Sequence, residues 1–287
     1  MRIVTLSDLH IGKWGDFGMN TLREVSRLDA DVLYFGGDLA EPDHDTPQRG
    51  WDRFERGLEM LAASPAPVKL FTLGNNDLEQ IRNSFVSEHY DEMASRVGAY
   101  GFSLLDAVPK VVGDVAFVGN VGWYDGTLWT KHCMDDVFGY PNDPAAIRAR
   151  ATAYFCGQEF KGRLLKNYSP DDLFAHCTER LSNHLDAVHA DTAVSAVVLG
   201  VHFVPSTQFV MGDTPKFAYL NWYMGSQAHA EHYLREKVVL GFTGHTHRSD
   251  AWSVGLLKVH NVSGPKQPRL FELEKSSDGL YVAKTVL

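Results

Sequence analysis

The chain has few cysteines for its 287 residues, and they are widely spaced. Cys133, Cys156 and Cys177 form no Cys-x-x-Cys pair, and an odd number cannot all pair within one chain. This sparse usage excludes a disulfide-stapled scaffold and a thiolate-based zinc site. The cysteines therefore predict reduced thiols in a cytoplasmic protein.

Long apolar runs and linker-like segments are also missing. No stretch approaches the ~20 apolar residues of a membrane span, and the first residues lack the apolar core of a secretory signal. No linker or low-complexity tract divides the chain, and its 44% hydrophobic content suffices for a full core. We therefore predict a single domain over residues 1–287 and no membrane partner.

Basic residues are scarcer than acidic ones. The chain has 27 Lys and Arg residues against 36 Asp and Glu residues, which gives a formal net charge of -9. This balance opposes extended binding to a nucleic-acid backbone, because such binding needs a clustered basic face. Phosphate chemistry at a small site stays compatible, since bound metal ions can supply the positive charge.

Short apolar runs alternate with helical patterns along most of the chain. The first third follows a βαβαβ pattern, which predicts a parallel sheet with covering helices, and the last third adds antiparallel strands. The predicted fold class is α/β, a mixed-sheet sandwich. The expected strands are 3–6, 32–35, 68–73, 110–112, 115–118, 196–201, 237–242, 251–254, 256–262, 269–274 and 280–286, and the expected helices are 21–28, 51–63, 78–96, 173–189 and 226–236.

Residues 123–172 interrupt this alternation. The segment is irregular and aromatic, with Trp129, Tyr140 and Phe155 among charged residues and prolines. We interpret it as an insertion over the sheet, part loop and part helix. A lid or substrate wall fits this pattern, and so does a peripheral cap that only packs.

Polar side chains directly follow five of the predicted strands. Ligand-binding loops of open α/β sheets converge at the carboxyl ends of the strands, so we expect these side chains at one edge. Each alone is typical of a turn or a surface histidine, and their coincidence favours a shared site. They are Asp8 and His10, Asp38, Asn75 and Asp77, His202, and His245 and His247.

The residue types and their spacing indicate metal ions. His245 and His247 stand one residue apart, as do Asp8 and His10, and on an extended segment such pairs point to the same side. Carboxylates, an amide oxygen and imidazoles without a thiolate suit manganese, iron or zinc. The seven candidate ligands, which are the strand-end residues above without Asp77, exceed the four of a structural zinc site, so we predict two divalent ions with one carboxylate between them.

The ordered motifs resemble the calcineurin-like metallophosphoesterase family of dinuclear metal phosphohydrolases. The resemblance implies an αββα sandwich with residues 123–172 as an inserted cap, and in-line attack on phosphorus by a metal-bridging hydroxide. The matching motifs are Asp8-x-His10, Gly37-Asp38, Gly74-Asn75-x-Asp77, His202 and Gly244-His245-x-His247. The implied ligands are Asp8, His10 and His247 for the first metal, Asn75, His202 and His245 for the second, and Asp38 as the bridge.

The sequence departs from the family's pattern at Asn76. Members that hydrolyse phosphomonoesters often have a histidine there, which helps to stabilise charge or to protonate the leaving group. Asn76 can hydrogen-bond a phosphate oxygen and is the candidate catalytic side chain, but an amide has no proton to transfer near neutral pH. We therefore hypothesise a phosphodiesterase that acts on a small nucleotide-like or other cytosolic phosphoester.

Other candidates for substrate contact each have two interpretations. Trp123 and Tyr124 either line the site or pack in the core. His132 is either the missing acid or a surface histidine, and Arg248 either clamps a phosphate or forms a surface salt bridge. The aromatic residues 217–223 form either a pocket wall or an oligomer contact.

Several alternatives compete with this function. A phosphomonoesterase, a pyrophosphatase or a nuclease of the same family would use the same ligands, and the acidic charge argues against a nuclease on long duplexes. A protein-binding scaffold on this fold is the alternative from another class, and the oligomeric state stays open. The presence of all seven ligands favours an enzyme over a scaffold.

Overall fold

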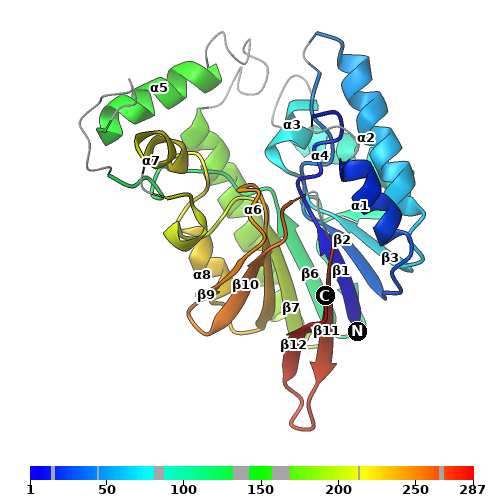
Figure 1. Cartoon of the computed structure of the whole chain (residues 1–287). Coiled ribbons are helices and arrows are strands. Elements are labelled where there is room, and N and C mark those ends of the chain that lie inside the picture. The colour runs from blue at the N-terminus through cyan, green and yellow to red at the C-terminus, as the bar shows by residue number, and fades with distance from the viewer. Residues whose placement is uncertain are drawn as a thin grey trace.

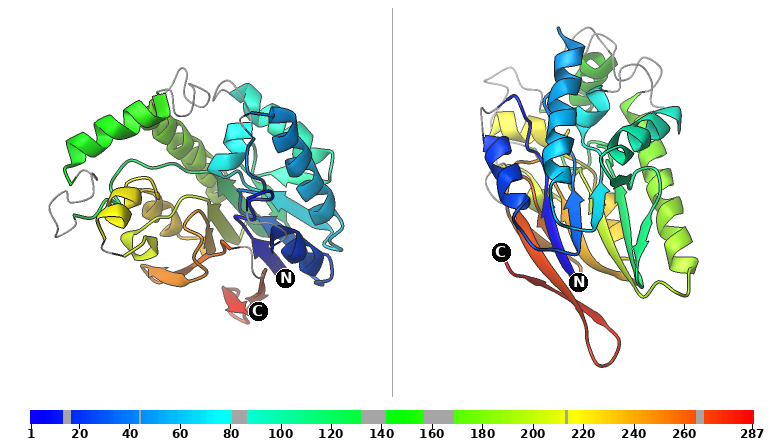
Figure 2. Two further views of the ribbon diagram at one scale, coloured as in Figure 1. Left: turned by 45° about the horizontal axis from the view of Figure 1, so that its top comes forward. Right: turned by 90° about the vertical axis from the view of Figure 1, so that its right-hand side faces the viewer.

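Two six-stranded sheets face each other at the centre of the protein, as Figure 1 shows. The computed structural model describes residues 1–13, 17–43, 45–80, 87–131, 142–156, 169–212, 214–264 and 268–287. Helices cover the outer faces of both sheets, so the layers run helix, sheet, sheet, helix (Figure 2). This arrangement confirms the predicted mixed-sheet α/β sandwich.

The first sheet combines parallel and antiparallel strands in the order β12-β11-β1-β2-β3-β4. The strands β1 to β4 are parallel, and β11 and β12 continue the sheet antiparallel. The apolar run Val32-Leu-Tyr-Phe35 is buried throughout, as expected for a strand covered on both faces. The bounds are β1 (Arg2–Leu6), β2 (Val32–Phe35), β3 (Val68–Phe71), β4 (Phe102–Leu104), β11 (Arg269–Lys275) and β12 (Tyr281–Thr285).

The second sheet has the order β5-β6-β7-β8-β10-β9. The strands β6, β7, β8 and β10 are parallel, while β5 and β9 are antiparallel edge strands. The bounds are β5 (Lys110–Val112), β6 (Val115–Asn120), β7 (Ala196–Val201), β8 (Val238–Thr243), β9 (Ala251–Val254) and β10 (Leu257–Asn261).

The helices divide between the two outer layers. The longest, α6, begins at Pro170 because Ser169 and Asp172 form a reciprocal capping box. The first sheet is covered by α1 (Phe17–Val25), α2 (Pro47–Ala62) and α4 (Ser87–Gly98), with the short α3 (Asn75–Gln80) at its edge. Beside the second sheet lie α5 (Pro144–Cys156), α6 (Pro170–Ala190), α7 (Pro215–Asn221), α8 (His229–Tyr233) and a 3-10 turn (Thr207–Phe209).

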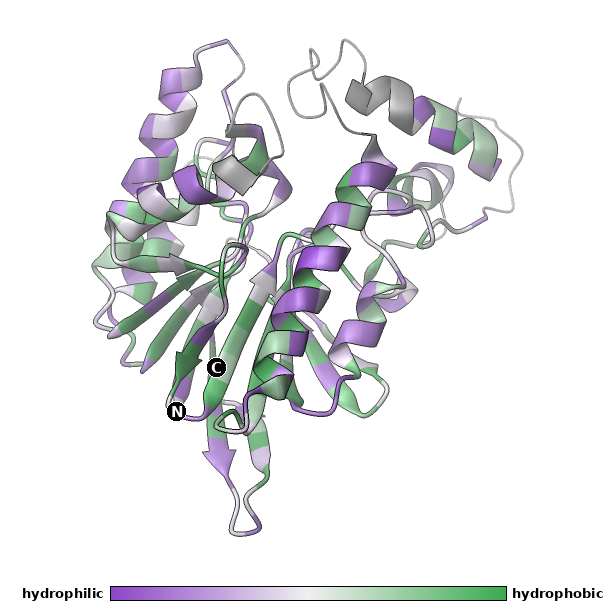
Figure 3. Ribbon diagram, turned by 180° about the vertical axis from the view of Figure 1, so that it is seen from behind, coloured by the Kyte–Doolittle hydropathy of each residue, from purple (hydrophilic) through white to green (hydrophobic). Residues whose placement is uncertain are grey.

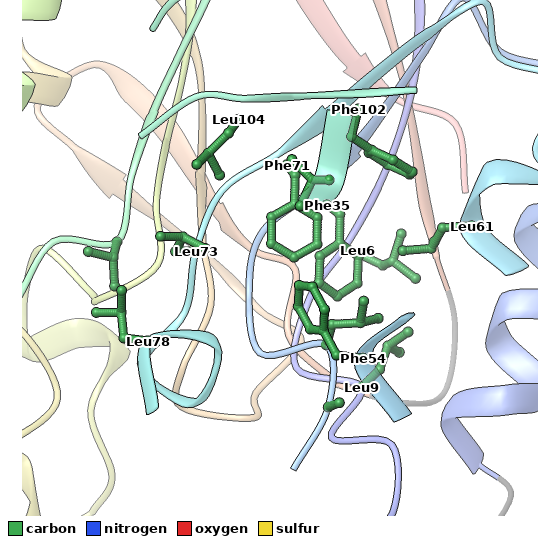
Figure 4. Packing of buried hydrophobic residues seen from close by; sticks show 14 of the residues in the cluster. Leu6, Leu9, Phe35, Phe54, Leu61, Phe71, Leu73, Leu78, Phe102 and Leu104 are labelled. Carbon is green, nitrogen blue, oxygen red and sulfur yellow. The ribbon is translucent and has the colours of Figure 1, made fainter. Parts of the chain in front are cut away.

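Three buried apolar clusters correspond to the three interfaces between these layers. One lies under α1, α2 and α4, where Phe35, Phe54 and Phe71 pack against one another (Figure 4). The second lies under α6 and includes Leu181 and Leu185, and the third fills the space between the sheets. Figure 3 accordingly shows mostly hydrophobic strands and helices that alternate hydrophobic and hydrophilic residues.

A tyrosine and two glycines determine how closely the two sheets approach each other next to the shared core. Tyr34 of the first sheet is buried, and its hydroxyl hydrogen-bonds Thr72 Oγ1 at 3.0 Å. A Cβ on Gly200 would lie 1.8 Å from the Tyr34 hydroxyl, and a Cβ on Gly119 would lie 2.2 Å from Thr72 Oγ1. Only glycine therefore fits at these two positions of the second sheet.

The structure differs from the expected elements at four points. The expected helix 78–96 is two helices, α3 and α4, and residues 81–86 lie outside the described residues. The strand β4 and the helix α7 were not expected, because each is too short for a clear period. The strand β10 is antiparallel to β9, as expected, but it also pairs in parallel with β8.

The described part of the region expected to be an insertion is part helix and part loop. The structure describes a loop at 123–131, then α5, then the start of α6. In the described part of the chain, no helix is long and apolar enough to span a membrane. The single domain over residues 1–287, with an insertion at 123–172, stays a prediction.

Candidate metal centre

The loops after β1, β2, β7 and β8 bring two groups of metal-type side chains together. In each group, one ligand atom per residue lies within 4.8 Å of the others. The loops lie at the carboxyl ends of the strands, at the upper edge in Figure 1, between α3 and α7. The first group is Asp8, His10 and His247, and the second is Asp38, His202 and His245.

Five of these six side chains stand on left-handed backbone. The φ angles are 58° at Asp8, 41° at His10, 57° at Asp38, 67° at His245 and 54° at His247, and no other described non-glycine residue has a positive φ. Such conformations cost free energy and cluster where function requires them. The expectation of extended pairs was wrong, since β8 ends at Thr243 and tight turns present both histidines.

Glycines let the ligand loops come close to one another. A Cβ on Gly74 would lie 2.1 Å from Asp38 Oδ1, so the loop after β3 fits only against a glycine. A Cβ on Gly244 would lie 2.8 Å from Asp8 Oδ2 and 3.0 Å from His202 Nδ1. Glycine at these positions creates the space that the ligand side chains occupy.

The nitrogen and oxygen atoms of the first group face a common point. His10 Nε2 lies 2.9 Å from His247 Nε2, and His247 Nε2 lies 3.4 Å from Asp8 Oδ1. The backbone N–H of His245 donates to the Asp8 carboxylate at 3.1 Å, which holds the two loops together. Two imidazole nitrogens and a carboxylate this close suit a shared cation.

Asp38 lies between the two groups. Its Oδ2 is 3.5 Å from His10 Nε2 of the first group and 3.6 Å from His202 Nε2 of the second. Hydrogen bonds to backbone carbonyls fix the tautomers of the two histidines in the second group. His202 Nδ1 donates to Gly36 O at 2.8 Å, and His245 Nε2 donates to Tyr223 O at 3.2 Å. His202 Nε2 and His245 Nδ1 are then left as metal-binding atoms.

Two buried polar atoms fit a bound cation. His202 Nε2 and Asn75 Oδ1 have no hydrogen-bond partner among the described residues, although both are buried. An unpaired buried acceptor costs free energy, and metal coordination would remove that cost. The donor set of imidazole, carboxylate and amide oxygen is the one that divalent manganese, iron or zinc accepts.

The pKa values of the ionisable side chains show that negative charge is crowded at the site, as expected where cations bind. Burial and the neighbouring Asp38 carboxylate raise the pKa of Asp77 to about 7, and burial with Asp38 and Glu41 raises the pKa of Glu79 to about 8. Burial opposes charge on His10, but hydrogen bonds to Asp8 and Glu41 raise its pKa to about 10. Without metal, His10 carries positive charge that divalent ions would supply instead.

The comparisons with known proteins decide the family. The family model described as calcineurin-like phosphoesterase matches residues 1–249. The chain belongs to the calcineurin-like phosphoesterase family. It is therefore a phosphoester hydrolase, and the recognition from the ordered motifs is confirmed.

Solved structures with the same fold support the assignment of architecture. A phosphopantetheinyl hydrolase from Mycobacterium tuberculosis is similar with a TM-score of 0.62 at 20% identity, over 92% of this chain and 89% of that one. A dimetal phosphatase from Danio rerio has a TM-score of 0.58 at 13% identity, over 99% of this chain and 95% of that one. No curated protein sequence matches this calcineurin-like phosphoesterase.

Two further carboxylates contact the ligand loops of the phosphoesterase centre. Asp77 accepts from the backbone N–H groups of Asp38 at 2.8 Å and Gly74 at 2.8 Å, so it ties the loops after β2 and β3 together. Glu41 Oε2 lies 3.1 Å from His10 Nδ1. Glu41 was not among the site residues expected from the sequence, although its place three residues after Asp38 in the same loop is a signal for it.

Asn76 does not present a free amide. Its Nδ2 lies 3.1 Å from Glu41 Oε2, and its Oδ1 accepts from Asn75 Nδ2 at 2.7 Å. Its backbone N–H donates to Asp38 Oδ1 at 2.8 Å. Asn76 thus connects Asn75 to the centre. Both the oxygen and the nitrogen of its own side-chain amide contact protein atoms.

Aromatic side chains line one side of the phosphoesterase centre. The Phe203 ring lies 4.3 Å from the His245 ring, and Tyr124 contacts both Phe203 and Tyr223. Tyr124 and Trp123 are buried, so both pack in the core, and Tyr124 also borders a pocket. That pocket is lined by Tyr124, Asp125, Arg148, Ser169, Pro170, Asp171 and Trp222.

The remaining sequence candidates have these places. Arg248 forms a salt bridge with Asp250 at 2.9 Å and donates to Val210 O, so it has the structural one of its two expected roles. Residues 217–221 belong to α7, and Trp222, directly after the helix, faces Arg148 of α5. His132 lies outside the described residues.

Proposed function

We propose that this protein is a dinuclear metal-dependent phosphodiesterase. It would prefer phosphodiester or activated phosphoanhydride substrates over alkyl phosphomonoesters. The observation that supports the dinuclear centre most strongly is the place of Asp38 Oδ2, within 3.6 Å of an imidazole nitrogen from each ligand group. One shared carboxylate between two sets of imidazoles is the arrangement that a pair of divalent ions requires.

In this proposal Asp8, His10 and His247 hold the first ion. Asn75, His202 and His245 hold the second, and Asp38 bridges them. Bound divalent ions supply Lewis-acid stabilisation of phosphoryl oxygens and acidify water. The ligands come from loops of both sheets, which Asp77 and the glycines hold together, so these side chains would fix the positions of bound ions.

Substrate preference follows from the protons that the site can and cannot provide. Asn76 occupies the position of the family's frequent histidine and carries no proton that it can give to a leaving group. Alkoxide leaving groups of alkyl monoesters need such a proton, while aryl or phosphate leaving groups need less help. The site therefore favours substrates with stable leaving groups.

The aromatic wall offers a place for the rest of a substrate. Tyr124 and Tyr223 connect the centre to the pocket that Arg148 and Trp222 border. An aromatic face and a guanidinium suit a nucleotide or another small anionic ester. Because a protein of this fold is named a phosphopantetheinyl hydrolase, a phosphopantetheinyl ester belongs among the test substrates.

The direct test is a substrate panel with the protein loaded with manganese, iron or zinc. We expect an aryl phosphodiester to turn over at least ~10-fold faster than an alkyl phosphomonoester, because general acid catalysis is typically worth ~10²–10⁴ and the Asn76 amide cannot provide it. Cyclic nucleotides, dinucleotides and pyrophosphates complete the panel. Comparable turnover of diester and monoester would contradict the proposed preference.

A variant sharpens the same test. Asn76→His restores the histidine of the family pattern next to Glu41, whose Oε2 already lies 3.1 Å from the Asn76 amide. We expect a lower diester-to-monoester ratio at saturating metal. An unchanged ratio would show that Asn76 does not determine the substrate preference. If the parent protein were inactive with every added metal, a protein-binding scaffold would be favoured over an enzyme.

We infer a cytoplasmic location from the cysteines. Cys177 is a free, buried thiol in α6, and the three cysteines are far apart in sequence. Burial raises the pKa of this thiol, so it behaves as an inert apolar side chain. Fractionation of cells that express the full chain tests this location.

A further inference from the structure

We propose that Asn76 is a positioning residue that, together with Glu41, fixes metal ligands from three separate loops. The inference rests on the ligands of the proposed function and differs from the direct phosphate contact expected for Asn76 from the sequence. Asn76 is 8% exposed and touches His10, Asp38 and Asn75, which belong to the loops after β1, β2 and β3.

Glu41 is the anchor of this arrangement. Its Oε2 lies 3.1 Å from His10 Nδ1 and 3.1 Å from Asn76 Nδ2, and its Oε1 lies 3.3 Å from Lys13 Nζ. His10 Nε2 faces Asp8, Asp38 and His247, so the proton of a metal-bound His10 belongs on Nδ1. Glu41 Oε2 then accepts from His10 Nδ1 and from Asn76 Nδ2, and these two donors lie 2.9 Å apart because both point to the same oxygen.

The orientation of Asn76 determines the orientation of Asn75. With Nδ2 directed to Glu41, Asn76 presents Oδ1 to Asn75 Nδ2, at 2.7 Å. The nitrogen of the Asn75 amide is thereby occupied, and Oδ1 is its only side-chain atom left without a protein partner among the described residues. An amide binds a cation through oxygen, so this hydrogen bond selects the rotamer that a ligand needs.

The backbone of the same residue fixes the proposed bridging ligand. Asn76 N–H donates to Asp38 Oδ1 at 2.8 Å, while Asp38 Oδ2 lies near His10 and His202. Asn76 therefore contacts one ligand of each proposed ion and the bridge between them. A phosphate contact by its side chain would require breaking the hydrogen bonds to Glu41 and Asn75.

The experiment is equilibrium dialysis of the full chain against manganese, with Asn76→Ala and Glu41→Gln compared with the parent. Loss of such supporting contacts typically costs ~10–100-fold in metal affinity. We expect both variants to bind manganese ~10–100-fold more weakly, and we expect Asn76→Ala to recover most of its turnover at saturating manganese. The Glu41→Gln side chain keeps its shape, so it carries the test if Asn76→Ala does not fold.

A matched control is Asn221→Ala in α7. Asn221 is a fully buried asparagine with hydrogen bonds to Thr130 and Met211, so its loss costs stability without touching the proposed ligands. Manganese affinity should stay at the parent value in this variant. An equal loss in Asn221→Ala would show that general destabilisation, and not positioning, weakens the metals.

The two proposals fail differently. Parent-like manganese binding by both variants, with a fall in kcat at saturating metal, would overturn the positioning role and leave the dinuclear centre intact. A parent protein that binds fewer than two manganese ions would overturn the proposed function and the positioning role with it. In the double variant, the combined loss should be smaller than the product of the single losses, because both act through one contact.

Discussion

At the residue scale, the most informative feature is the left-handed backbone under the proposed ligands. All five described non-glycine residues with positive φ are among the seven ligands expected from the sequence. Each such residue costs roughly 1–2 kcal/mol relative to a right-handed conformation, less for Asp, so the fold carries this cost where the metals would bind. Metal binding provides a physical reason for keeping it.

His247 allows this strain to be measured. The residue has φ 54°, and its side chain is 36% exposed, so packing contributes less here than at His245. Without metal, we expect His247→Gly to be more stable than His247→Ala by about 1 kcal/mol, because only glycine adopts this backbone without strain. Thermal unfolding of both variants in excess chelator measures the difference.

The pair of variants contains its own control. Both lose the imidazole, so they differ only in the cost of the backbone conformation. Alanine is ordinarily the more stable choice, because glycine loses more conformational entropy on folding. His247→Ala at least as stable as His247→Gly would show that the position is not strained.

At the element scale, Asp106 joins the ends of two strands from different sheets. Its carboxylate accepts from Leu73 N after β3 at 2.7 Å and from Val121 N after β6 at 2.6 Å, and the residue is fully buried. Burial raises the pKa of Asp106 to about 6. The carboxyl therefore both holds the loop that precedes Asn75 and responds to pH.

The sign of that response follows from the raised pKa. Between about pH 4 and pH 6 the folded chain holds the Asp106 proton that the unfolded chain has lost, so stability falls as pH rises through this window. A side-chain amide does not titrate, so the Asp106→Asn variant lacks this pH dependence. We expect the parent's advantage over Asp106→Asn to shrink by on the order of 2–3 kcal/mol from pH 4 to pH 7.

Denaturant unfolding of both proteins at the two pH values, in chelator, measures the change. The surface variant Asp52→Asn, on α2, serves as the control, because Asp52 is exposed. A constant difference between parent and Asp106→Asn across this range would show that Asp106 does not titrate there.

The elements themselves were largely predictable from the sequence. Buried parallel strands such as β7 appear as continuous apolar runs, and the long helix α6 has a cap and a clear period. The short β4 and α7 were not, because three to seven residues give no period and are fixed by tertiary contacts. The parallel direction of β10 depends on a crossover that local pattern does not encode.

The same limit applies to the site. Polar residues after strand ends predicted which side chains converge, since the carboxyl ends of parallel strands share an edge. The left-handed turns at His245 and His247 and the partners of Asn76 were not predictable, because they depend on loops that are distant in sequence. The place of Glu41 three residues after Asp38 is a signal in the sequence, but its contacts with His10 and Asn76 are not.

At the scale of the whole molecule, the centre lies where the two sheets meet. The first sheet supplies Asp8, Asp38 and Asn75, and the second supplies His202 and His245. The spacing between the sheets therefore also sets the spacing between the ligand groups. Gly200, on β7 two residues before His202, controls that spacing because it faces the Tyr34 hydroxyl.

We expect Gly200→Ala to destabilise the fold by about 1–3 kcal/mol and to weaken metal binding, because its Cβ would lie 1.8 Å from the Tyr34 hydroxyl. Denaturant unfolding and manganese dialysis measure the two effects. Gly98→Ala in α4 is the control, since a Cβ there meets nothing within 4 Å, so metal binding should stay unchanged and stability should not fall. A parent-like Gly200→Ala would show that the sheets are not set by this contact.

The most direct test of the dinuclear centre is to locate manganese by anomalous scattering in crystals of the parent, His245→Ala and His247→Ala. We expect two ions in the parent, one on either side of Asp38. His247→Ala should keep the ion beside His202, and His245→Ala should keep the ion beside His10. A single ion in the parent, or loss of the same ion in both variants, would contradict the shared centre.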